Sequence, residues 1–132
     1  MDRRPRRAPP ERALSVTIHW SAVLFGALTG FTASLGVFLV LGIAGVIDGE
    51  SVLLIVLVYA GQLLAGYVGG RFAGSNGPLH GGLAALGLSF LTAALAVAAG
   101  TEPAVPTLAL LLAVAAIIGT GGGALADRHR RK

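Results

Sequence analysis

Cysteine is absent from this chain of 132 residues. Disulfide bonds and thiolate metal sites are therefore excluded. Charge is also scarce, since only 12% of the residues are Asp, Glu, Lys or Arg, whereas 55% are hydrophobic. So few charges cannot cover the surface of a soluble domain of this length, and the composition indicates a membrane protein.

The apolar residues form four long runs rather than amphipathic stripes. These runs cover residues 18–47, 52–70, 79–99 and 107–126. Each is long enough to cross a bilayer as a helix, which takes about 20 residues. The first run is longer than a bilayer requires, so we expect it to tilt, protrude or loosen near Gly42 and Gly45.

The links between the first and second runs and between the third and fourth are short, which predicts antiparallel neighbours. The expected fold is therefore all-α, a polytopic antiparallel bundle of four transmembrane helices. The bundle would occupy residues 13–126, with a disordered basic tail at 1–12 and a second basic tail at 127–132.

All ten basic residues lie on one side of this predicted bundle. They are Arg3, Arg4, Arg6, Arg7, Arg12, Arg71, Arg128, Arg130, Arg131 and Lys132. The opposite side receives only the acidic residues Asp48, Glu50 and Glu102. Because cytoplasmic flanks gather Lys and Arg during insertion, we expect both termini in the cytoplasm and Arg71 at the cytoplasmic interface. The basic start is not interpreted as a signal peptide, because the apolar run after it is too long.

The two basic tails have two interpretations. They serve topology alone, or they also contact anionic lipid headgroups. Nucleic acid is the poorer partner, because the tails lack interleaved aromatic residues and a folded basic face. The abundance of arginine, alanine, glycine and valine is typical of a GC-rich bacterial genome, so the expected location is a bacterial cell membrane.

Glycine is concentrated in "GYVGGRFAGSNGPLHGG", residues 66–82. A dinucleotide or phosphate loop would place such glycines after a strand and at the opening of a helix, whereas here they close a helix. Gly66, Gly70 and Gly74 recur every four residues, which predicts a helix face for close packing within the bundle or between subunits. Gly74 also suits a helix C-cap, and Pro78 suits the first turn of the next helix.

Polar residues inside the apolar runs are few, and no Asp, Glu, Lys or Arg lies in the central part of any run. Gln62 is the most polar deep residue. We predict that it makes an inter-helix hydrogen bond; the alternative is that it lines a pore. His19 and His80 lie at the starts of their helices and could face each other. Hydrogen bonds to backbone or water are expected there. Two histidines without a carboxylate or thiolate supply too few ligands for a metal site.

The stretch "AGYVGGRFAGSNGPLHGGLAALG", together with four short helices, resembles the YrzE-like family of small, uncharacterised integral membrane proteins of bacteria. The resemblance extends from about Trp20 to Gly123, and its specific part is the glycine, arginine and "LHGG" stretch. It implies a four-helix membrane protein and no particular activity.

Three classes of function follow from the sequence. The leading one is a non-enzymatic scaffold, modulator or self-associating membrane component, without cofactor or metal, since no catalytic set of side chains is present. The second is a small oligomeric channel or transporter that uses Gln62 and the hydroxyls of Thr29, Thr32 and Ser34. The third is a protein that binds anionic lipid through its basic ends. A continuous polar cavity at Gln62 would favour the second class, and a dry core the first.

Overall fold

The structure, a computed structural model, describes residues 17–46 and 52–132. These ranges contain four helices, α1 (Trp20–Ile43), α2 (Val52–Ala73), α3 (Gly77–Ala98) and α4 (Val105–Arg130). Each helix is long and apolar enough to cross a membrane. The prediction of an all-α, four-helix membrane bundle is confirmed. The predicted tail at residues 1–12 and the acidic link at Asp48 and Glu50 lie outside the described residues.

The first helix is shorter than predicted, because it ends at Ile43 instead of continuing to residue 47. Gly45 has a φ of +67°, a left-handed conformation that glycine adopts without steric cost. The N–H groups of Gly45 and Val46 then bond back to the carbonyls of Gly42 and Leu41, which satisfies the last turn of α1. The expected loosening near Gly42 and Gly45 is therefore a helix end. Gly100 closes α3 with the same geometry.

Three other boundaries extend by two to three residues beyond the predicted ones, at the end of α2 and at the starts of α3 and α4. Helix α2 continues to Ala73, and α3 begins at Gly77 with Pro78 in its first turn. The largest difference is at α4, which was predicted to end at residue 126 but continues to Arg130. Residues 127–130 are thus the last helical turn rather than part of a tail, because their side chains bind the ends of α2 and α3, as described below.

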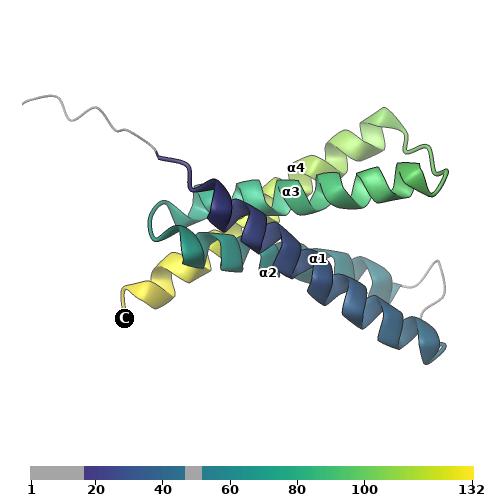
Figure 1. Cartoon of the computed structure of the whole chain (residues 1–132), viewed down its shortest axis with the longest axis horizontal. Coiled ribbons are helices and arrows are strands. Elements are labelled where there is room, and N and C mark those ends of the chain that lie inside the picture. The colour runs from purple at the N-terminus through teal and green to yellow at the C-terminus, as the bar shows by residue number, and fades with distance from the viewer. Residues whose placement is uncertain (1–16, 47–51) are drawn as a thin grey trace, which may run out of the picture.

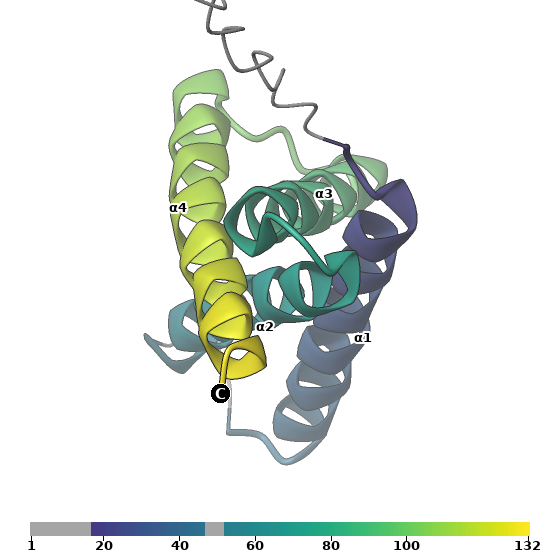
Figure 2. The same ribbon diagram turned by 90° about the vertical axis from the view of Figure 1, so that its left-hand side faces the viewer.

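Helices α2 and α3 occupy the centre of the bundle, with α1 and α4 on opposite sides (Figure 2). Both central helices contact all the others, whereas α1 and α4 do not touch within the described part of the chain. The order of packing is therefore α1, then the α2–α3 pair, then α4.

One end of the bundle is tightly closed and the other is open (Figure 1). At the closed end lie the start of α1, the turn between α2 and α3, and the end of α4. Toward the open end the α1–α2 pair and the α3–α4 pair diverge. All buried residues of the four helices fall in the closed half, within residues 22–30, 61–73, 77–88 and 115–126. The rest of α1 and α2 is here named the first arm, and the rest of α3 and α4 the second arm.

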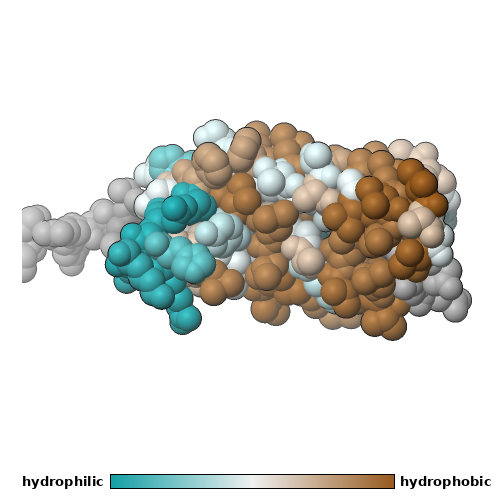
Figure 3. Space-filling view, turned by 90° about the horizontal axis from the view of Figure 1, so that it is seen from below, coloured by the Kyte–Doolittle hydropathy of each residue, from teal (hydrophilic) through white to brown (hydrophobic). Residues whose placement is uncertain are grey.

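The buried core is built almost entirely from alanine and glycine. Its hydrophobic members are Ala22, Val23, Ala27, Ala65, Ala73, Ala84, Ala85, Leu88, Ala115 and Ala126. Small side chains let helix backbones approach closely, which is how helices associate in lipid without a hydrophobic driving force. Large apolar side chains face outward instead, and hydrophilic residues gather at the closed end (Figure 3).

Candidate functional site

Helix α2 carries two glycine faces that pack against different helices. Its first face, which contains Gly61 and Gly69, lies against α1. A Cβ atom added to Gly26 of α1 would lie 2.6 Å from the carbonyl oxygen of Ala65, and one on Gly30 would lie 2.8 Å from that of Gly61. These separations are shorter than real Cβ contacts, so α1 and α2 meet backbone to backbone.

The second face of α2 holds Gly66 and Gly70, two of the three glycines predicted to form a packing stripe. A Cβ on Gly66 would lie 2.6 Å from the Cα of Gly119, and one on Gly70 would lie 2.7 Å from the Cα of Gly123. Helix α3 joins the same cluster, because a Cβ on Gly81 would lie 2.7 Å from the Gly66 carbonyl oxygen. Three helices therefore converge on glycine here.

Two parts of the sequence-based expectation for this stripe need correction. Gly74 does not pack with Gly66 and Gly70, because it lies beyond the end of α2 with a φ of +73°. Within the described ranges, the atom nearest to its Cβ position is a guanidinium nitrogen of Arg130, 3.9 Å away. The Gly66–Gly70 face is also covered by α3 and α4 of the same chain, so it does not offer a surface to another subunit.

His19 and His80 do come together at the closed end, with ring centroids 5.7 Å apart. The side chain of His80 is fully buried. Its Nε2 accepts a hydrogen bond from the backbone N–H of His19 at 2.9 Å, and its Nδ1 lies 3.0 Å from the carbonyl oxygen of Asn76. Since a carbonyl accepts and an N–H donates, the proton of a neutral His80 is on Nδ1.

This geometry leaves neither ring nitrogen of His80 free to bind a metal ion. The described ranges, 17–46 and 52–132, also contain no group of three His, Cys, Asp or Glu side chains that could hold one. The hydrogen bond between His19 and His80 links the start of α1 to the start of α3.

The last turn of α4 clamps the turn between α2 and α3. Asp127 accepts a hydrogen bond from the backbone N–H of Gly77 at 3.1 Å, at the start of α3. Arg130 pairs with Asp127 and also donates to the carbonyl oxygen of Gly70, at 3.2 Å, in the last turn of α2. The carboxylate meets the positive end of one helix and the guanidinium the negative end of another, so both helix dipoles are complemented.

Asp127 and Arg130 were not predicted to form a site, because residues 127–132 were predicted to be a basic tail. Their spacing of three residues was an available signal, since it places both side chains on one helix face. Arg71 and the other basic residues of the closed end, Arg128, Arg131 and Lys132, are exposed. They make a rim of positive charge around the clamp.

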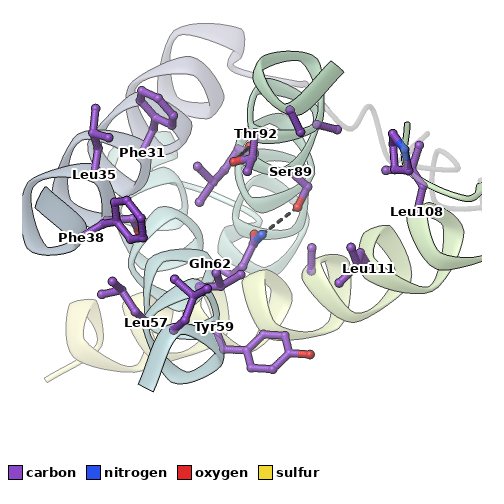
Figure 4. Close-up of a pocket in the computed structure, with 18 residues that line it drawn as sticks. Phe31, Leu35, Phe38, Leu57, Tyr59, Gln62, Ser89, Thr92, Leu108 and Leu111 are labelled. Carbon is purple, nitrogen blue, oxygen red and sulfur yellow. Dashed lines mark hydrogen bonds between the residues drawn. The ribbon is translucent and has the colours of Figure 1, made fainter. Parts of the chain in front are cut away.

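A cleft separates the two arms, and 18 residues from all four helices and the α3–α4 link line it (Figure 4). Its volume is about 370 Å³. Most of the lining is aliphatic or aromatic, including Phe31 and Phe38 from the first arm and Leu108 and Leu111 from the second. The floor of the cleft, where it meets the packed half, is formed by its three buried lining residues, Gln62, Leu88 and Ala115.

Gln62 links α2 to α3 at this floor. Its Nε2 donates to the hydroxyl oxygen of Ser89 at 2.7 Å (Figure 4). Gln62 thus makes the inter-helix hydrogen bond expected from the sequence, and it also lines this cleft. Ser89 was not among the predicted residues, because a serine in an alanine-rich helix gives no signal of its partner.

Two buried oxygen atoms in the cleft have no hydrogen-bond partner in the described part of the chain, Oε1 of Gln62 and Oγ of Ser34. Thr29 and Thr92 behave differently, because their hydroxyls donate to the carbonyl four residues earlier in the same helix. The Ser34 hydroxyl instead lies against the backbone of Gly61. An unpaired buried polar group costs about 1–3 kcal/mol, so both atoms favour a partner from outside the chain.

The cleft does not continue through the molecule. Directly below its floor, toward the closed end, the backbones of α2, α3 and α4 meet at Gly66, Gly81 and Gly119. The arrangement can therefore hold an apolar molecule or segment from the open side, with the glycine contacts of the described helices packed beneath it.

Comparisons with models of known protein families, with curated proteins and with solved structures found no match to this chain. The resemblance to the YrzE-like family stays a prediction.

Proposed function

We propose that the protein is a non-enzymatic scaffold or modulator of a bacterial cell membrane, which associates with membrane helices, including other copies of itself, through its two arms. The observation that supports this proposal most is the division of the bundle into a packed half and an open half. All buried residues of the described helices lie in the closed half, so the arms, with exposed side chains such as Leu39, Val56 and Leu110, have no packed core of their own.

The closed half supplies the rigidity that a scaffold needs. Glycine contacts, the His80 bonds and the Asp127–Arg130 clamp hold the helices at that end. The arms are thereby held at a fixed angle, and their apolar surfaces are available to other helices in the bilayer. We place both termini and Arg71 in the cytoplasm, so the arms would open toward the opposite side.

Self-association can be tested by energy transfer between separately labelled copies in liposomes. We expect transfer above the level of a monomeric membrane protein at equal density, and a decrease when unlabelled copies are added in excess. Transfer equal to that of the monomeric control at every density would contradict self-association.

Binding of anionic lipid is a second candidate function, supported by the exposed basic rim. Arg71, Arg128, Arg131 and Lys132 are exposed beside the closed end, at the level where lipid headgroups lie if the helices span the bilayer. Each such base near an anionic surface contributes about 1 kcal/mol. Native mass spectrometry from mixed-lipid nanodiscs should show retained anionic lipid, and less of it after Arg128→Gln combined with Arg131→Gln. Equal retention of anionic and zwitterionic lipid would exclude this role.

The channel alternative receives less support. Gln62 does line a cavity, but the cavity is mainly apolar and ends on helix-to-helix glycine contacts. Hydroxyls that could extend a polar path, such as that of Thr29, are bonded to their own helix. We therefore propose that no ion passes through a single bundle.

A further inference from the structure

The cleft between the arms has the chemistry of a small-molecule site. Its volume of about 370 Å³ falls in the range of about 300–1,000 Å³ that is typical of ligand pockets. Such pockets have mainly hydrophobic and aromatic walls with a few polar groups that fix orientation. Here the walls are mainly apolar, and the polar lining residues are Ser34 of α1, Tyr59 and Gln62 of α2, and Ser89 and Thr92 of α3.

The unpaired oxygens at the base indicate what kind of ligand fits. Gln62 is 6% exposed, and its Oε1 has no donor within the described ranges although its Nε2 is bonded to Ser89. Oε1 can only accept a hydrogen bond, whereas the Ser34 hydroxyl can donate one. A ligand hydroxyl can do both, because it carries one proton and two lone pairs.

Two other occupants of the cleft are less suitable. A helix with side chains is about 10–12 Å across, so one running along the arms needs far more space than about 370 Å³. A plain lipid chain fits the apolar walls, but its carbon atoms would leave Oε1 and Oγ unpaired. A compact molecule with an apolar body and a hydroxyl group satisfies both the walls and the two oxygens.

We propose that the cleft binds a small hydrophobic alcohol or phenol from the bilayer. Its hydroxyl would lie at Gln62 and Ser34, and its apolar body between Phe31 and Phe38 of the first arm and Leu111 of the second. This is a ligand site in addition to the proposed scaffold role, and either can be wrong without the other.

The test uses two probes of similar size and shape, 1-naphthol and 1-methylnaphthalene, of which only the first has a hydroxyl. Binding is measured by equilibrium dialysis of protein in nanodiscs, with protein-free nanodiscs subtracted. We expect 1-naphthol to bind about tenfold more tightly than 1-methylnaphthalene, the factor that one net hydrogen bond supplies. In Gln62→Met this difference should disappear.

A matched pair of variants on α3 tests the location independently of Gln62. Ala93 lines the cleft, whereas the neighbouring Ala94 is exposed and does not. Ala93→Trp should abolish binding of both probes, and Ala94→Trp should leave it unchanged. Equal affinity of the wild-type protein for both probes would overturn the proposal, as would selectivity that persists in Gln62→Met. Binding unaffected by Ala93→Trp would also overturn it.

Discussion

His80 accepts a hydrogen bond at Nε2 from the backbone N–H of His19, 61 positions earlier in the chain. The bond joins the first residue before α1 to the first turn of α3, and the opposite ring nitrogen is used by Asn76. Only one of the two histidine side chains is therefore required for the contact, since His19 contributes its backbone.

Substitution of the two histidines should have unequal effects for this reason. His80→Phe should lower the free energy of unfolding by about 1–3 kcal/mol, because a buried backbone N–H loses its acceptor. His19→Ala should change it by less than about 0.5 kcal/mol, as expected for an exposed side chain. Denaturation in mixed detergent micelles measures both values. Similar losses in the two variants would show that the side chain of His19 takes part.

Glycines of α4 should differ according to the face on which they lie. Gly123→Ala should lower the free energy of unfolding by about 1–3 kcal/mol, because a Cβ there would collide with the backbone of Gly77 and Pro78. Gly121→Ala is the control, since nothing lies within 4 Å of that Cβ position, and we expect stability to be unchanged or slightly raised. The same micelle assay distinguishes them, and equal destabilisation would contradict the packing described.

The clamp at the end of α4 predicts coupling between two charged residues. Asp127→Ala removes the side-chain acceptor of the Gly77 N–H and the ion-pair partner of Arg130, which keeps its bond to the Gly70 carbonyl, so we expect a loss of about 1–2 kcal/mol. Arg130→Ala should also destabilise, and the double variant should lose less than the sum of the single ones. Arg128→Ala, on the exposed side of the same turn, serves as the control. Strict additivity would mean that Asp127 and Arg130 act separately.

The orientation in the membrane can be tested simply, because the chain has no native cysteine. A cysteine introduced at Ser75, in the turn between α2 and α3, should resist an impermeant thiol reagent added outside intact cells. One at Glu102, in the link between α3 and α4, should react. Labelling at residue 75 with protection at 102 would reverse the proposed topology.

Ion flux through purified protein in liposomes should not exceed that of protein-free vesicles. The reason is the close contact of helix backbones at Gly66 and Gly119, which fills the space between α2 and α4 next to Gln62. The appropriate control is Gln62→Leu, which removes the amide at the end of the cleft. Ion-selective flux in the wild-type protein that this variant abolishes would show that the closed half opens.

Much of the fold was predictable, because apolar run length and charge placement depend on the bilayer rather than on side-chain detail. Four spanning helices and the helix break around Gly74 and Pro78 follow from that physics. The end of α1 was harder to predict. The apolar run is compatible with a helix that continues to residue 47, and Gly45 permits a helix end without requiring one.

The site was less predictable, because it depends on which faces meet. The spacing of Gly66 and Gly70 indicated a contact but not its partners on α3 and α4. Gln62 was identified as polar and deep, whereas Ser89 looked like any small residue until the two helices were placed together. The divergence of the arms was not predicted either, because small residues such as Ala93, Ala94 and Ala96 also occur in the second arm.

The divergence of the two arms gives the molecule a wedge shape. With its helices across a bilayer, the chain displaces little area in the leaflet around the closed end and more area in the leaflet around the open end. In a flat membrane, this unequal area strains the two leaflets. A membrane that is concave on the side of the closed end has a smaller leaflet area there and relieves the strain. We therefore expect the bundle to prefer membranes whose curvature matches this shape.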